Sequence, residues 1–421
     1  MKASPLLLSK TELFQTWRQQ SAAFVFFILL FCLSLFSEYQ QYKKLTQFDE
    51  YISTAWVEKQ YRKNEHWVLK LQSTEGFSFY TTSKEDLKPL DGYFVQVKLF
   101  TDRITFFSFL KGFYAHSRID YRLEKKQERY RLMHQLDDVH GERTAPLFKA
   151  LFLAGPIPKS LRDKLSAWGI NHLLAISGFH LGVLGFIVFF ILNTLYRPVQ
   201  NQFFPYRHAR KDIALTVTVL LFGYLYFLDF VPSLLRAFSM SVFAYILYDR
   251  GIKILSFSSL FIVVSFLIAM WPKLLFALGF WFSVAGVFFI FLFLHHLKEL
   301  KPWQSFLLLH IWVYLAMLPL VHYFYGTFSL YQLYSPLLTM LFIVFYPLEL
   351  FIHVITEGAR LDFVLEWFLN IKTKTIEVIL PLWALLIYLI LSLLSIFDRR
   401  FFYLLLFLCM TTLGYFLYRI A

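Results

Sequence analysis

The sequence predicts a polytopic α-helical membrane protein, with about nine or ten transmembrane helices and a small β-rich domain outside the membrane. Three observations support this fold class. Of the 421 residues, 58% are hydrophobic and only 16% are charged, which is unusually apolar for a soluble chain. Several apolar runs reach the roughly 20 residues that a membrane-spanning helix requires. One polar stretch near the N-terminus has the alternation of β-strands instead.

The first apolar run covers residues 21–36 and is preceded by Lys2, Lys10 and Arg18. Basic residues before the first span favour a cytoplasmic N-terminus. A cleaved signal peptide is the alternative, but no small-residue cleavage site follows the run. We therefore expect an N-terminal transmembrane anchor over residues 1–37.

The polar segment that follows predicts an extracytoplasmic domain over residues 38–115. Within residues 51–110, rough alternation and Gly-containing turns indicate about four or five short strands, which suit a small barrel or sandwich. Residues 123–136 have the pattern of a charged amphipathic helix. We therefore expect residues 116–170 to form an extracytoplasmic helical linker.

The remaining residues, 171–421, predict a multi-helix membrane domain. After the first run, the predicted spans are 172–195, 213–230, 233–248, 254–270, 275–294, 305–321, 336–355, 378–397 and 401–418. Basic loops alternate with loops poor in Lys and Arg, so most of the +13 net charge is explained by cytoplasmic loops. The alternation fails near the end, where simple counting puts residues 398–400 (DRR) outside. Pro347 and Glu349 interrupt the run over 336–355, and a re-entrant or broken helix there is the alternative that would restore the alternation.

The most informative segment, residues 171–182, reads NHLLAISGFHLG at the start of an apolar run. Polar side chains are costly inside a bilayer and indicate a functional site. In a continuous helix, small residues would form one stripe for close helix packing: Ala175, Gly178, Gly182 and Gly185. The opposite face would present Ser177 and His180 to a cavity, near His172. Helix capping at the headgroup level is the alternative role for these polar side chains.

Two further charges lie within predicted spans. Arg236 follows Pro232 by about one helical turn, and a guanidinium inside a membrane usually faces protein, water or an anion. Asp229 is a candidate ion-pair partner for it, and snorkelling to the surface is the alternative. Glu349 is the second intramembrane charge.

Motifs for enzymatic chemistry are missing from the sequence. It contains neither a phosphate-binding loop nor a recognisable metal-ligand motif, so we expect no ATPase or metal-nuclease activity, no metal and no cofactor. Cys32 and Cys409 both lie in apolar runs, which excludes a disulfide framework. Ser177 and His180 on one helix lack the third group of a hydrolase. We therefore assign no catalytic residue.

The motif segment belongs to an ordered set of blocks. Residues 151–158 (LFLAGPIP), 168–170 (WGI) and 171–182 resemble the signature of the ComEC family, the inner-membrane channel of natural DNA transformation. Further blocks follow in the family's order at residues 232–237, 278–283 and 318–329. The resemblance covers about residues 145–350, and residues 51–110 would correspond to the family's OB-like domain.

The resemblance implies that one DNA strand passes through the membrane domain into the cytoplasm. It implies pore positions at His172, Ser177, His180, Arg236, Trp281 and Ser283. It also places Gly279 among the helix-packing positions. Many family members have an acidic residue where this chain has Pro156. Many also carry a C-terminal metallo-β-lactamase-like domain, and we expect this chain to be a short form without it.

The implied partners are single-stranded DNA, an extracytoplasmic DNA-binding receptor, a cytoplasmic motor or strand-binding proteins, and membrane lipids. The oligomeric state is left open, with a homo-oligomer as one alternative. Aromatic residues make up 20% of the chain and would offer stacking surfaces for bases. Two alternatives remain open: a transporter of another anionic solute or lipid-linked precursor with Arg236 as the anion contact, and an intramembrane serine hydrolase using Ser177.

Overall fold

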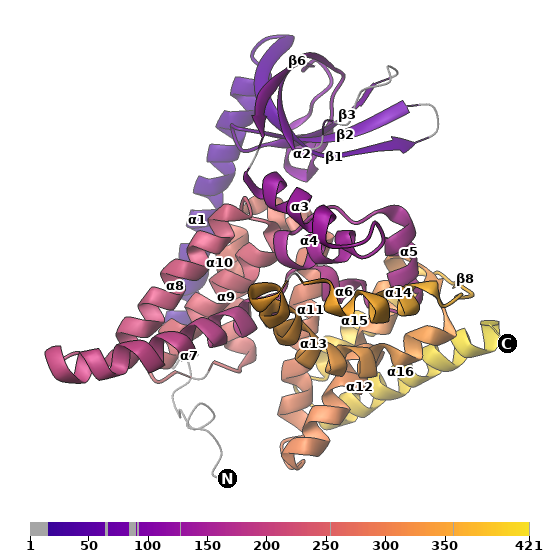
Figure 1. The fold of residues 1–421 in the computed structure, drawn as a ribbon. Helices are drawn as coiled ribbons and strands as arrows, with labels where there is room; N and C mark the ends of the chain where they lie inside the picture. Colours follow the sequence, from indigo (N-terminus) through magenta and orange to yellow (C-terminus); the bar gives the residue numbers. More distant parts are fainter. Residues whose placement is uncertain are drawn as a thin grey trace. The chain divides into compact units, whose positions relative to one another are not determined.

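The computed structural model describes residues 16–63, 66–83, 90, 92–126, 128–252, 254–356 and 358–420. These residues form two compact units. The β unit comprises the described residues of Glu12–Gln135 together with Phe261–Phe280. The helical unit comprises the described residues of Leu136–Leu260 and Trp281–Ala421 (Figure 1).

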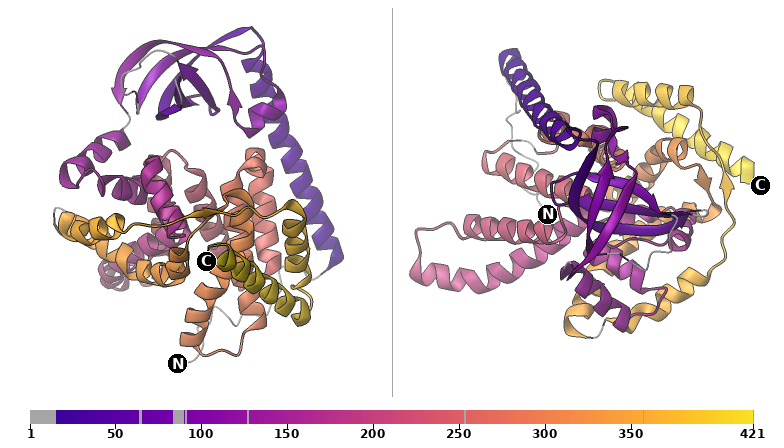
Figure 2. Two further views of the ribbon diagram at one scale, coloured as in Figure 1. Left: turned by 90° about the vertical axis from the view of Figure 1, so that its right-hand side faces the viewer. Right: turned by 90° about the horizontal axis from the view of Figure 1, so that it is seen from above.

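The β unit is built on a six-stranded sheet with the strand order β5-β3-β2-β1-β4-β6. The strands are β1 (Glu50–Lys63), β2 (His66–Ser73), β3 (Ser78–Ser83), β4 (Tyr93–Phe100), β5 (Phe113–Tyr114) and β6 (Ser117–Lys126). Neighbouring strands are antiparallel except for the parallel pair β3 and β5. The sheet is strongly curled, like half of a barrel (Figure 2). The predicted β-rich domain is confirmed, and its OB-like character stays a prediction.

One face of the curled sheet carries the core of the β unit. Alternate residues of each strand point to the same face, so Val57, Leu69 and Val95 are buried together. Phe79 stacks on Phe113 with 5.8 Å between ring centroids. Helix α2 (Phe106–Lys111) and the last residue of α1 (Trp17–Leu45) add apolar side chains to this core. The first long helix is therefore anchored in the β unit.

The amphipathic helix predicted over residues 123–136 begins later than expected. Strand β6 runs to Lys126 and pairs with β4 as far as Tyr93, and helix α3 spans Glu128–Val139. Pairing with β6 satisfies backbone groups along the edge of β4 that would otherwise be open. The linker predicted to be helical from residue 116 therefore starts with a strand, because a tertiary hydrogen-bond ladder outweighs the local helical pattern.

Six described helices are long and apolar enough to cross a membrane. They are α1, α7 (Gly178–Phe203), α11 (Leu278–His296), α12 (Pro302–Phe324), α13 (Ser335–Ile355) and α16 (Arg399–Ile420). Helices α10 (Phe257–Met270) and α15 (Leu382–Leu394) are apolar, but with 14 and 13 residues they are shorter than the roughly 20 residues a span requires. The polytopic helical fold is confirmed, with fewer full-length spans by this criterion than the sequence predicts.

Apolar clusters in the described part of the helical unit include three that join its helices in groups and a smaller one around Phe328 and Phe416. The first joins α7 to α8 (Ala209–Phe227) and α9 (Pro232–Asp249), and the second joins α11, α12, α15 and α16. The third joins α13 to four shorter helices, α4 (Ala145–Leu153), α5 (Lys159–Ala167), α6 (Asn171–Leu174) and α14 (Asp362–Asn370). Short elements complete the fold: β7 (Thr327–Phe328), β8 (Ile376–Glu377), η2 (Pro272–Phe276), η3 (Leu330–Tyr334) and η4 (Ala359–Leu361).

The alternative of a helix broken at Pro347 does not occur. Helix α13 continues through this residue from Ser335 to Ile355. Proline removes one backbone donor, and packing against neighbouring helices allows a membrane helix to tolerate it. Phe342 and Tyr346, which precede Pro347 on α13, are buried in the third cluster. This packing holds α13 in one piece.

Candidate functional site

The motif segment is divided between two helices. Helix α6 contains His172 and ends before Ala175, and α7 begins at Gly178 with Ser177 as its N-cap residue. The His180 Nδ1 atom accepts a hydrogen bond from the Ser177 backbone N–H at 3.1 Å and lies 3.0 Å from Ser177 Oγ. Ser177 and His180 therefore meet at the start of α7, in the capping arrangement that the sequence left open.

The small-residue stripe is shorter than predicted, because Ala175 lies outside the helix. A Cβ atom on Gly178 would lie 3.8 Å from a side chain of α9, and one on Gly185 would lie 3.3 Å from Leu221 of α8. A Cβ atom on Gly182 would meet no atom within 4 Å. Of the four predicted positions, only Gly185 therefore lies at a tight contact, which it makes with α8; a Cβ atom on Gly178 would make an ordinary van der Waals contact with α9.

His180 packs against α13. Its side chain is 2% exposed, and its ring lies 4.5 Å from the ring of Tyr346 and 5.4 Å from that of Phe342, measured between centroids. In the described part of the chain, no carboxylate forms a hydrogen bond or ion pair with His180. The Ser177–His180 pair thus lacks the third group that orients the imidazole in a serine hydrolase.

The other predicted positions lie on separate elements. Arg236 is 7% exposed on α9, and its proposed ion pair with Asp229 stays a prediction. The exposed His172 has its Nε2 atom 3.4 Å from Thr339 Oγ1 of α13. On α11, Gly279 and Trp281 are exposed and Ser283 is half-buried. The structure therefore joins Ser177 to His180 and links His172 to α13, whereas Trp281 and Ser283 belong to a different helix.

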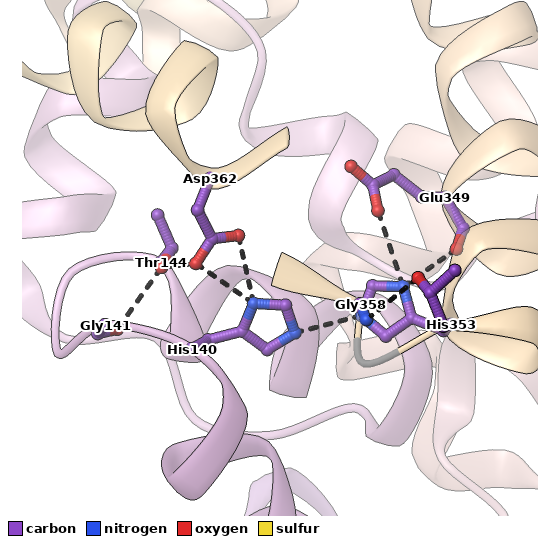
Figure 3. A network of polar contacts seen from close by, with 8 residues as sticks. His140, Gly141, Thr144, Glu349, His353, Gly358 and Asp362 are labelled. Atoms are coloured by element: carbon purple, nitrogen blue, oxygen red, sulfur yellow. Dashed lines mark hydrogen bonds and ion pairs between the residues drawn. The ribbon is translucent and has the colours of Figure 1, made fainter. Parts of the chain in front are cut away.

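A second group of polar side chains lies where α13 approaches α14 and the loop between α3 and α4 (Figure 3). The Nδ1 atom of His140 lies 3.0 Å from Asp362 Oδ1 and 3.1 Å from Oδ2. Its Nε2 atom lies 3.0 Å from Nε2 of His353, whose Nδ1 atom donates to the Glu349 backbone carbonyl at 2.7 Å. Thr144 Oγ1 donates to Asp362 Oδ2 at 2.8 Å. These five residues form a continuous chain, here called the histidine network.

The histidine network is shielded from solvent. The His140 side chain is fully buried, and the Glu349 side chain is 0% exposed, with Oε2 3.4 Å from His353 Nδ1. The His140 ring stacks on Phe148 at 4.0 Å. A Cβ atom on Gly358 would lie 2.9 Å from the His353 ring, so the glycine permits this close packing. Electrostatic interactions are stronger in such an environment, and so are hydrogen bonds.

The network and the motif segment share a helix. Phe152 lies 4.9 Å from the His353 ring and 6.2 Å from the Tyr346 ring, between centroids. Tyr346 in turn contacts His180. A single band of aromatic rings along α13 therefore connects the start of α7 to the histidine network.

Most of this network is missing from the sequence prediction. Only Glu349 was recognised, as an intramembrane charge. One signal for His353 exists, because Glu349 and His353 are four residues apart and face the same side of a helix. His140 and Asp362 lie 222 residues apart in the chain, and no local pattern connects them. Contacts of this kind are fixed by tertiary packing.

The fold and site define a class: a polytopic helical membrane protein with a curled β-sheet unit and polar networks between its apolar helices. A family model described as competence protein matches residues 154–420. The chain belongs to this family, which is the family that the motif blocks resemble. No curated protein and no solved structure matches the chain. The family assigns this protein a role in competence, which is the uptake of DNA. The family is generally one of transport channels.

Proposed function

We propose that this protein forms the channel through which single-stranded DNA crosses the bacterial inner membrane during natural transformation. The observation that carries the proposal is the extent of the competence family match. It runs from residue 154 to residue 420 and so includes five of the six candidate spans, all except α1. The same range contains the motif segment, Arg236 and Trp281. This extent supports a function carried by the membrane helices.

The chemistry of the site suits a polyanion. A pore for DNA needs fixed positive or dipolar groups, aromatic surfaces and contacts weak enough for release. Arg236 carries a guanidinium on α9 at 7% exposure, and its neighbours Leu235 and Ala237 pack against the apolar cluster of α7, α8 and α9. Trp281 presents an exposed indole on α11, on which a base would stack. His180 and Ser177 act by fixing the start of α7 beside α13.

The domain assignments follow from this function. Residues 1–37 would anchor the chain with its N-terminus in the cytoplasm. The β domain over 38–115 and the linker over 116–170 would receive a strand outside the membrane from a DNA-binding receptor. Residues 171–421 would form the channel. A motor or strand-binding proteins in the cytoplasm would give the movement its direction, and lipids would surround the helices.

Deletion of the gene in a transformable host tests this function. We expect labelled DNA to be bound at the cell surface and to fail to reach a nuclease-protected, single-stranded cytoplasmic form. Expression of the wild-type chain from a plasmid should restore entry. Unchanged arrival of single strands in the deletion strain would overturn the proposal. Normal DNA entry with loss of a different anionic solute would favour the alternative transporter.

A further inference from the structure

The hydrogen bonds of the histidine network determine how many protons it holds. A backbone carbonyl only accepts hydrogen bonds. The Nδ1 atom of His353, 2.7 Å from the Glu349 carbonyl, must therefore carry a hydrogen. In a neutral imidazole one ring nitrogen donates and the other accepts. The Nε2 atom of a neutral His353 is consequently an acceptor.

The same reasoning applies to His140. Its Nδ1 atom lies within 3.1 Å of both oxygens of Asp362, and an ionised carboxylate only accepts. A neutral His140 paired with this carboxylate would also present its Nε2 atom as an acceptor. The two Nε2 atoms lie 3.0 Å apart. Two acceptors at this distance repel each other unless a hydrogen lies between them.

The number of hydrogens that the network needs does not depend on which atom carries each of them. One hydrogen is needed between His353 and the Glu349 carbonyl, one between the two Nε2 atoms, and one between His140 and Asp362. Two neutral histidines and an ionised aspartate supply one hydrogen fewer than this. A proton moved from His140 to Asp362 changes its position and leaves the total unchanged. The geometry therefore needs one additional proton.

The surroundings favour one added proton over two. Two carboxylates offset a single positive charge: Glu349 on α13, which is buried, and Asp362 on α14, which is partly buried. Glu366 of α14 lies close to Gly141 in the adjoining loop. Burial is the largest influence on the pKa of His140 and lowers it, and a charge on His353 lowers it further, against the opposing effects of Asp362 and Glu349. A second proton is disfavoured by geometry, because two positively charged rings would then face each other with their Nε2 atoms 3.0 Å apart.

We infer that His140 and His353 form a proton-binding site that holds one shared proton in the native protein, next to the buried Glu349 of α13. Loss of the proton at high pH leaves two acceptors facing each other. Addition of a second proton at low pH places two cations side by side. Either change weakens the contact between α13 and the loop before α4. This inference is independent of the DNA cargo.

The shared proton produces a distinctive dependence of stability on pH. In the unfolded chain each histidine has a pKa of about 6.5, so the two together hold on average one proton at that pH. Above it the folded pair holds more protons than the unfolded pair, and stability falls as the pH rises. Below it the folded pair holds fewer, and stability falls as the pH drops. The contribution of the pair is therefore greatest near pH 6.5.

Nitrogen NMR of the full chain, labelled with ¹⁵N in its 12 histidines and held in lipid nanodiscs, tests this site directly. We expect one pair of Nε2 resonances coupled to each other through the hydrogen bond at neutral pH. The coupled pair should disappear in His140→Asn and in His353→Asn, which keep a donor at the Nδ1 position. It should persist in His208→Asn, a change at an exposed histidine. The wild-type spectrum identifies the coupling even if a variant does not fold.

Two NMR results would overturn the inference. The first is a wild-type spectrum in which every histidine has ordinary, uncoupled nitrogen resonances. The second is a spectrum that changes on addition of a chelator, because a metal ion between the rings would then replace the proton.

Thermal midpoints of wild type and His140→Asn from pH 5 to pH 9 provide an independent measurement. A difference that is largest near pH 6.5 supports the shared proton, whereas one that rises steadily with pH contradicts it.

Discussion

Replacing Arg236 with methionine is expected to reduce the import of labelled DNA by about 10- to 100-fold. A hydrogen bond to a charged group contributes about 1.5–3 kcal/mol, and the loss of one such bond corresponds to this reduction. Methionine keeps much of the length and apolar character of the side chain and removes its charge. Arg236 is 7% exposed on α9, where its neighbours Leu235 and Ala237 pack against the cluster of α7, α8 and α9. The effect should therefore fall on strand passage, with surface binding of DNA unchanged.

Two control variants separate charge from general damage. Arg236→Lys retains the charge without the planar fork of donors, and we expect intermediate import. Arg197→Met removes an exposed cation from α7 and should leave import close to the wild-type rate. Thermal midpoints in detergent must be compared for all three variants. Wild-type import by Arg236→Met would contradict a role in the pore, and a lowered midpoint would identify a structural role instead.

Replacing Gly185 with leucine is expected to destabilise the protein by about 1–3 kcal/mol, the usual cost of overpacking. The new Cβ atom alone would lie 3.3 Å from Leu221 Cδ1 and 3.7 Å from Val217 Cγ1. The rest of the side chain would extend into the contact between α7 and α8. These helices would have to separate, which should lower the thermal midpoint of the detergent-solubilised chain.

Gly182→Leu is the matched control for this prediction. It lies on the same helix three residues earlier, and a Cβ atom there meets nothing within 4 Å. Leucine has a higher helix propensity than glycine, by about 1 kcal/mol. The control should therefore be neutral or slightly stabilising. Equal midpoints for the two variants would mean that Gly185 does not determine the packing of α7 on α8.

The sequence predicts the architecture better than the details within it. Apolar runs and strand alternation are local patterns, and they identify the helical membrane fold and the β-rich domain. Errors occur where tertiary contacts override such patterns. Residues 123–126 belong to β6 because β4 offers an edge for pairing. The helix expected from His172 begins only at Gly178, because Ser177 provides an N-cap. Pro347 remains inside α13, whose neighbours are packed around it.

The candidate site is predicted only in part, for a related reason. Ser177 and His180 are three residues apart, so their contact is local and visible in the motif. His140 and His353 are 213 residues apart, and each is unremarkable in its own segment. Their contact exists because α13 is long enough to bring its C-terminal turn to the loop before α4. A single sequence does not contain that information in any local pattern.

The passage of a DNA strand among the membrane helices is tested most directly by cross-linking in transforming cells. A photo-reactive phenylalanine analogue replaces Trp281, which is 40% exposed and lies in one of the family's motif blocks. In a control variant the analogue replaces Phe186, which is 70% exposed on α7. Labelled DNA is then added and the cells are illuminated during uptake. We predict cross-links from position 281 to single-stranded DNA and none from position 186. Normal DNA import without any cross-link at position 281 would contradict the channel assigned to these helices.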